Sequence, residues 1–272
     1  GNSGSGGSSG SNSSTTSKEI VGAEKVTLDV PYGEKTADEA LAAIPKNVTL
    51  NLKDGKTISA TVTEWKWASG VNYDSKPTAD TPLTAEGSFT VPSGYTYSGS
   101  TTVQATVTVK ALDETKLKAA KKAYADLQGK QIFDEKEAAM DKEKILIKDS
   151  TPDQITAGVR FATPKDWQPL DDAIKSVKNQ ETVGFASQKE CNETADILQA
   201  AIDEFIQKKV KVGTNTTTDA YILQQVKEYP LNPDRGRYAY SSDMQPLKSG
   251  YAYWLYINNG WSVPNSSVNV SI

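Results

Sequence analysis

The chain has 272 residues, of which 24% are charged, and its formal net charge is −4. This length suggests one to three domains, and without a basic stripe nucleic acid is not an expected partner. The sequence has no histidine, which excludes a Ser-His-Asp triad, a Cys-His dyad and histidine-based zinc or iron sites. Cys191 is the one cysteine, so no intrachain disulfide can form, and no apolar run approaches the roughly 20 residues of a membrane span.

Residues 1–17 consist of Gly, Ser, Asn and Thr alone. This composition is typical of a flexible linker or of a remnant of an expression vector. Linkers of this kind tether modules in exported proteins, and the rest of the chain is rich in Thr, Ser, Asn, Lys and Tyr. We therefore expect a protein that is secreted by a bacterium or displayed on its cell surface.

Residues 18–111 show the alternation of polar and apolar residues that is typical of β-strands. The clearest run is Val103, Ala105, Val107 and Val109. An Asp-Gly pair at 54–55 marks a hairpin turn, and a capping box at Thr36 and Glu39 predicts one short helix over 37–44. Several short strands separated by turns favour an antiparallel β-sandwich.

Residues 112–236 show a helical period and are predicted to form a helical domain. The apolar face of its first helix is Leu117, Ala120, Tyr124 and Leu127. The charged stretch 134–148 predicts a second, solvent-exposed helix, and Thr151-Pro152 predicts another helix start. A capping box at 187–190 is followed by an apolar helical stripe that contains Cys191, which is expected to be a small core side chain.

Two starts are open for the helix that contains Trp167. The helix can begin at Thr163-Pro164, or at Asp166, which places Pro169 in the first turn and is preferred because an interior proline loses a hydrogen bond. Residues 237–272 are strand-like again and are too short for a separate domain, so we expect them to pack on the other parts.

Two segments resemble known bacterial modules. VPYG at 30–33, IPKNVTLNLKDGKTISATVTEW at 44–65 and the strands that end at 111 resemble the bacterial Ig-like domains of surface proteins. TPKDWQPLDDAI at 163–174 and ADILQAAIDEF at 195–205 resemble the three-helix FIVAR modules of Gram-positive surface proteins. About 25 extra residues at 131–155 depart from the FIVAR pattern and put a simple spacer role in doubt.

The layout as a whole resembles the first domain of an amylosome starch adherence system protein, a family that holds starch for secreted amylases without catalysis. The resemblance rests on architecture and composition. The patterns along the chain together predict an α+β fold with an N-terminal Ig-like antiparallel β-sandwich, a helical cluster and a short aromatic-rich C-terminal β segment.

The C-terminal segment is strongly enriched in aromatic residues. Seven of the 25 residues from Arg237 to Trp261 are Tyr or Trp, while the whole chain is 8% aromatic. Sugar rings stack on aromatic faces, and Asn258-Asn259-Gly260 predicts a hairpin that places Trp254 and Trp261 on paired strands. The predicted ligand-binding residues here are Trp254, Trp261, Tyr256 and Tyr253. The alternative is that these aromatic residues form the hydrophobic side of a small sheet.

Arg235 and Arg237 lie in a loop beside this segment, where they can hydrogen-bond to vicinal sugar hydroxyls unless the loop is only a solvated turn. Trp67 and Tyr73 are further candidates for ligand binding. Without a bulge, Trp65 and Trp67 lie on the solvent face of their strand, whereas a bulge near Glu64 buries them. We expect Trp65 to be buried.

No enzyme is expected. The carboxylate pairs Asp171-Asp172 and Asp134-Glu135 lie on helices rich in Lys and Glu, which is typical of a solvated face, although paired carboxylates can hydrolyse glycosides. Because the sequence has no phosphate-binding glycine loop and no calcium loop, neither a cofactor nor a metal is expected. Trp167 is expected to be a core residue.

Two hypotheses for the function follow. The first is a carbohydrate-binding protein of the bacterial surface, whose ligand is a polysaccharide or oligosaccharide, with an α-glucan such as starch favoured. Other proteins of a surface complex are further candidate partners. The second is a structural spacer or adhesin stalk that displays other modules or binds a host protein.

Overall fold

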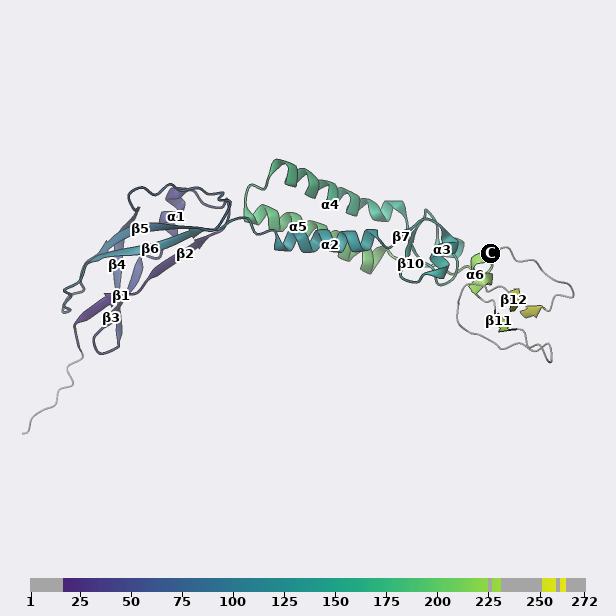
Figure 1. Cartoon of the computed structure of the whole chain (residues 1–272), viewed down its shortest axis with the longest axis horizontal. Coiled ribbons are helices and arrows are strands. Elements are labelled where there is room, and N and C mark those ends of the chain that lie inside the picture. The colour runs from purple at the N-terminus through teal and green to yellow at the C-terminus, as the bar shows by residue number, and fades with distance from the viewer. Residues whose placement is uncertain (1–16, 225–226, 231–250, 258–259, 263–272) are drawn as a thin grey trace, which may run out of the picture. The chain divides into compact units, whose positions relative to one another are not determined.

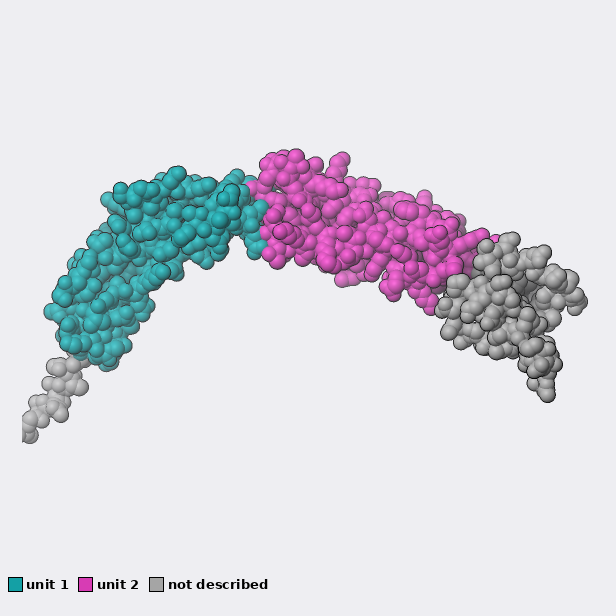
Figure 2. All heavy atoms as spheres, viewed as in Figure 1, with its two compact units in different colours: residues 1–113, 186–190 teal, residues 114–185, 191–272 magenta. Residues whose placement is uncertain are grey.

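The computed structural model describes residues 17–224, 227–230, 251–257 and 260–262, with side chains through residue 222. The described residues form a mixed α+β structure with six α-helices and a curled β-sheet (Figure 1). The α+β class expected from the sequence is therefore confirmed. The chain divides into two compact units, one of residues 1–113 with 186–190 and the other of residues 114–185 with 191–272 (Figure 2).

Unit 1 is built on a six-stranded sheet in the order β1-β3-β4-β5-β6-β2. The β2 and β6 strands pair in parallel, and the other neighbours are antiparallel. The strands are β1 (Ile20–Ala23), β2 (Val26–Val30), β3 (Asn47–Leu52), β4 (Thr57–Trp67), β5 (Thr81–Phe89) and β6 (Thr102–Val109). The short helix α1 (Ala37–Ala43) follows β2, and its N-cap is Thr36, whose hydroxyl accepts the amide of Glu39, as the capping box predicts.

The long strand β4 changes partners along its length. Its first half pairs with β3, and its second half pairs with β5. Between Val62 and Trp65 the register with β5 shifts by one residue, which is a β-bulge. The extra residue inverts the alternation of faces: Ala60 and Val62 are buried before it, and Trp65 is buried after it. The expected burial of Trp65 is therefore confirmed, and its indole Nε1 donates to the Pro45 carbonyl at 3.1 Å.

Gly87 lies opposite the bulge and makes room for it. A Cβ atom on Gly87 would lie 2.5 Å from Cγ1 of Val62 and 2.9 Å from Cε3 of Trp65. Real Cβ atoms do not approach other atoms so closely, and both neighbours are packed in the core of the unit. Glycine is therefore required at this position by space and not by backbone conformation.

The Gly87→Ala variant is expected to lower the free energy of unfolding of unit 1 by about 1–3 kcal/mol, because Trp65 must move within a packed core. Urea unfolding followed by tryptophan fluorescence measures this loss. Gly22→Ala is the matched control, since nothing lies within 4 Å of a Cβ atom there. Its expected effect is under about 0.5 kcal/mol, and equal midpoints for both variants would contradict the packing described at the bulge.

Residues 186–190, which include the first three residues of the helix α5 (Gln188–Glu204), belong to unit 1 although they lie far along the chain. The side-chain amide of Gln188 exchanges two hydrogen bonds with the backbone of Asp113, at 2.8 and 2.7 Å. Gly33 has φ +69°, and a Cβ atom there would lie 2.1 Å from the carbonyl oxygen of Ala186. Both the backbone conformation and the close approach therefore require glycine at this position.

Unit 2 contains a helical cluster formed by α2 (Thr115–Gln128), α4 (Pro164–Val183) and α5 (Gln188–Glu204), with the short π-helical turn η2 (Phe205–Lys209) after α5. Its aromatic centre is Trp167, whose ring meets Phe205 edge-on at 4.9 Å and lies 6.3 Å from the ring of Tyr124. The core positions expected for Trp167 and Cys191 are confirmed. The apolar face of α2 is buried as expected: Leu117, Ala120, Tyr124 and Leu127.

The α4 helix begins at Pro164, so the preferred start at Asp166 was wrong. The hydroxyl of Thr163 accepts the amide of Asp166 at 3.1 Å, and the Asp166 carboxylate accepts the amide of Thr163 at 3.0 Å. This capping box satisfies free amides of the first turn, and Pro164 at the first position has none to satisfy. Pro169 lies inside the helix, which tolerates the loss of one hydrogen bond.

A second correction concerns residues 134–148, which do not form one helix. The α3 helix (Glu135–Met140) is short, and β8 (Ile145–Ile147) follows it fully buried. This strand pairs in parallel with β7 (Gln131–Ile132) and β9 (Arg160–Ala162), and β10 (Lys211–Val212) adds to β9 antiparallel. A strand that is buried on both faces reads as a continuous apolar run, and Ile-Leu-Ile is such a run.

The remaining elements complete unit 2. A single 3₁₀ turn, η1 (Pro152–Gln154), stands at the predicted helix start, and α6 (Asp219–Gln224) follows β10. A three-stranded antiparallel sheet comes after α6, in the order β11-β12-β13. Its strands are β11 (Lys227–Pro230), β12 (Tyr251–Ile257) and β13 (Gly260–Ser262).

Candidate functional site

Five aromatic residues of the C-terminal segment lie on the paired strands β12 and β13: Tyr251, Tyr253, Trp254, Tyr256 and Trp261. Tyr256 of β12 pairs with Trp261 of β13, and Ile257 pairs with Gly260, so two residues connect the strands. On its other side β12 pairs with β11, where Trp254 is opposite Lys227. The pairing is continuous along these strands and fixes which positions share a face.

Register divides the predicted ligand-binding residues into two sets. Directly opposed residues share a face of a sheet, and so do residues two apart on one strand. Positions 254, 256 and 261 therefore share one face with position 227. Position 253 falls on the opposite face with 255 and pairs with Glu228. Trp254, Tyr256 and Trp261 thus form one aromatic set, here called the aromatic face, to which Tyr253 does not belong.

Trp67 and Tyr73 lie in unit 1 and form a second aromatic pair. Their ring centroids are 5.5 Å apart with planes tilted by 38°, and both side chains are half-buried against the core. The Tyr73 hydroxyl donates to the carbonyl of Lys35 at 2.8 Å. Burial, followed by the nearby charge of Glu39, raises the pKa of the Tyr73 phenol, which therefore remains a neutral donor.

The indole Nε1 of Trp67 is buried and has no hydrogen-bond partner among the described residues. The bulge in β4 explains the intermediate position of this ring, because it turns Trp67 to the same face as the buried Trp65. The pair has a fixed orientation and keeps part of its surface open. Arg235 and Arg237 lie outside the described residues.

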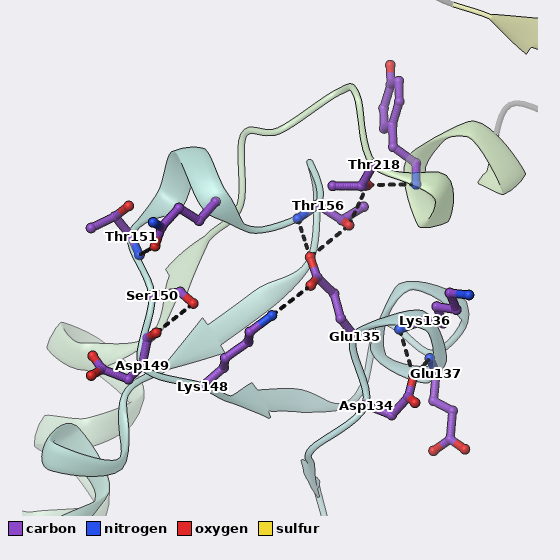
Figure 3. Close-up of polar contacts among 12 residues, drawn as sticks. Asp134, Glu135, Lys136, Glu137, Lys148, Asp149, Ser150, Thr151, Thr156 and Thr218 are labelled. Atoms are coloured by element: carbon purple, nitrogen blue, oxygen red, sulfur yellow. Dashed lines mark hydrogen bonds and ion pairs between the residues drawn. The ribbon is translucent and has the colours of Figure 1, made fainter.

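A polar cluster in unit 2, here called the Glu135 network, was not predicted from the sequence (Figure 3). One carboxylate oxygen of Glu135 accepts both the amide and the hydroxyl of Thr156, at 2.7 and 2.9 Å. The other oxygen lies 3.3 Å from the ammonium of Lys148. The hydroxyls of Thr156 and Thr218 are 2.7 Å apart, and Thr156 is fully buried.

Competing influences set the charge state of Glu135. Burial raises the pKa of its carboxyl, but the amide and hydroxyl of Thr156 and the ammonium of Lys148 outweigh burial and hold the pKa below its ordinary value. The carboxylate form is therefore the one that the folded unit favours. Its contribution to stability is present above the unfolded pKa and is lost as the pH falls through the folded pKa.

The Glu135→Ala variant is expected to lower the free energy of unfolding of unit 2 by about 2–3 kcal/mol, because it leaves two buried donors of Thr156 without an acceptor. Thermal or urea unfolding at neutral pH measures the change. Glu137→Ala is the matched control, since Glu137 is an exposed residue of the same helix. A loss in Glu135→Ala no larger than in the control would show that the network contributes little.

The candidate carboxylate pairs have local partners. Asp171 accepts the indole Nε1 of Trp167 at 3.0 Å, and Asp172 accepts the side-chain amide of Gln168 at 2.9 Å. Asp134 caps α3 through the amides of its first turn. In the part of the chain that the structure describes, no three acidic or cysteine side chains are grouped to hold a metal ion. None of the described helices is long and apolar enough to cross a membrane.

Comparison with known proteins gives no match to this chain: no protein-family model, no curated protein and no solved structure matches it.

Proposed function

We propose that this chain is a non-catalytic carbohydrate-binding protein of a bacterial cell surface, and that the aromatic face binds an α-glucan. The observation that carries the proposal is the register of β12 and β13, which gathers Trp254, Tyr256 and Trp261 on one face. Aromatic rings offer flat apolar faces to the C–H faces of sugars, and Tyr and Trp add a polar edge for hydroxyl groups. Rigid aromatic residues also lose little conformational entropy on binding.

The spacing of the aromatic face suits a chain-like ligand. Positions 254 and 256 are two residues apart on one strand, roughly 6.8 Å along it. Position 261 lies directly across from 256, roughly 4.5–5.5 Å away. Three neighbouring aromatic positions on two strands can contact consecutive sugar rings, and Lys227, which is opposite Trp254, adds a hydrogen-bond donor beside them.

The two family resemblances concern the fold, and taken alone they favour the alternative of a spacer or adhesin stalk. We propose that the six-stranded sheet of unit 1 is an Ig-like domain and that α2, α4 and α5 form a FIVAR-like module. The extra residues 131–155 of that module contain β7, α3, β8 and η1. Of these elements, β7 and β8 join β9 and β10 in a four-stranded sheet. This part of the unit has a small core of its own, which a simple three-helix spacer does not need.

The Trp254→Ala and Trp261→Ala variants are each expected to weaken binding of maltoheptaose at least about fivefold, close to 1 kcal/mol, with unchanged circular dichroism. Isothermal titration measures the affinity. Tyr253→Ala is the matched control, since it removes an aromatic residue of β12 from the opposite face. Equal losses in all three variants, or no loss in either tryptophan variant, would contradict binding at the aromatic face.

We further propose that Trp67 and Tyr73 make a second contact with the glycan. Trp67→Ala is expected to weaken binding of soluble starch by unit 1 about two- to fivefold. Trp67→Phe keeps an apolar ring against the core and is the control for stability. A lower melting temperature with unchanged affinity in Trp67→Ala would show that the pair serves packing alone.

A further inference from the structure

We infer that Glu135 is a positioning residue for the aromatic face: through Thr156 and Thr218 its carboxylate fixes the start of α6, the helix that leads into β11. The expected effect on ligand affinity rests on the proposed carbohydrate binding, whereas the expected effect on hydrogen exchange of α6 does not. No residue of the network lies on the aromatic strands, so its effect on them must pass through α6.

The hydrogen bonds of the network run in one direction. A carboxylate can only accept, so the single hydroxyl proton of Thr156 goes to Glu135. The Thr156 oxygen then accepts the hydroxyl proton of Thr218, which is 2.7 Å away. The Thr218 oxygen in turn accepts the amide of Tyr221 at 3.1 Å. The chain of donors therefore ends on the negative charge of Glu135, and each bond polarises the next.

This chain reaches the N-terminus of α6. Thr218 precedes the helix, its hydroxyl accepts from Tyr221, and its carbonyl accepts the amide of Ile222 at 3.0 Å. The α6 helix has six residues, and an isolated helix of that length is not stable in water. It lies beside α3 and β12, and β11 begins three residues after it ends. Contacts that hold the first turn of α6 therefore also hold the entry to the aromatic strands.

Backbone bonds bring the segment before α6 to the same place. The amide of Asn215 donates to the carbonyl of Ile155, and the amide of Ala157 donates to the carbonyl of Asn215, both at 2.8 Å. Gly213 has no room for a side chain, since a Cβ atom would lie 2.2 Å from the carbonyl oxygen of Thr156. These bonds place Thr218 over Thr156, and Glu135 attaches both to α3.

The charge of Glu135 makes this attachment dependent on pH. The charged or titratable side chains on α3 and on the elements around it include Asp134, Lys136 and Glu137 beside Glu135 itself, Lys148 after β8, Asp153 of η1, Arg160 of β9, and Asp219 and Tyr221 of α6. Of these, Lys148 makes the ion pair with Glu135. Protonation of the carboxyl removes that ion pair and weakens the bonds from Thr156, so the start of α6 loosens in acid.

Hydrogen exchange measured by mass spectrometry on the full chain tests the inference. In Glu135→Ala, the amides of Tyr221 and Ile222 are expected to exchange at least tenfold faster than in the unsubstituted protein, while those of α2 stay unchanged and exclude global unfolding. Glu137→Ala is expected to leave both sets unchanged. Unchanged exchange of α6 in Glu135→Ala would overturn the inference.

Glu135→Gln separates charge from shape, since its amide oxygen can still accept from Thr156. As the pH falls through the folded pKa of Glu135, which is held below its ordinary value, the protection factors of the α6 amides in the unsubstituted protein are expected to fall toward those of Glu135→Ala. In Glu135→Gln the protection factors, which are exchange rates corrected for their intrinsic pH dependence, are expected to stay constant. Equal pH profiles would overturn the role of the charge. If Glu135→Ala does not fold, Thr218→Val removes the relay without altering Glu135, and the same tenfold rise is expected.

The affinity of the Glu135 variants for maltoheptaose tests whether the Glu135 network affects ligand binding. Glu135→Ala is expected to weaken binding threefold or more, and Glu135→Gln less. Faster exchange of α6 with unchanged affinity would overturn the positioning of the aromatic face. If Trp254→Ala and Trp261→Ala both leave affinity unchanged, the proposed function fails, whereas the exchange data still decide whether Glu135 holds α6.

Discussion

In β4, one extra residue between Val62 and Trp65 inverts the alternation of faces, and the core of unit 1 depends on this inversion. The first half of the strand pairs with β3 and the second half with β5, so a single strand serves both parts of the curled sheet. Because the bulge lies at that change of partner, Trp65 is buried beside Val62 and Trp67 is held at the edge of the core. Gly87 provides the space that this arrangement needs.

In the C-terminal strands β12 and β13, the alternation of faces continues without a bulge. No register shift separates the pairs between β12 and β13, so alternation persists and Tyr256 stays opposite Trp261. The same rule that turns Trp65 into the core of unit 1 and Trp67 toward its edge gathers aromatic positions on one face here. Carbohydrate binding is proposed at that face for this reason, and the Glu135 network bears on it through α6, the element that joins the strands to the small core of unit 2.

Sequence periodicity predicted the features whose causes are local. The capping box at Thr36 and the buried face of α2 depend on residues within a few turns of one another, whereas the core position of Trp167 was implied by the FIVAR resemblance. The strand β8 was missed because three buried residues stand within a charged stretch, and β7 and β10 have two residues each. The Glu135 network joins residues 21 and 62 positions apart, and only tertiary structure brings such residues together.

Native affinity electrophoresis through gels that contain soluble starch, xylan or β-glucan shows whether the protein binds an α-glucan. Binding of an α-glucan predicts that migration is retarded by starch and not by the other two polysaccharides. Retardation by xylan or β-glucan instead would keep a glycan site and contradict the ligand. Unretarded migration in all three gels would contradict carbohydrate binding and favour a spacer or adhesin stalk.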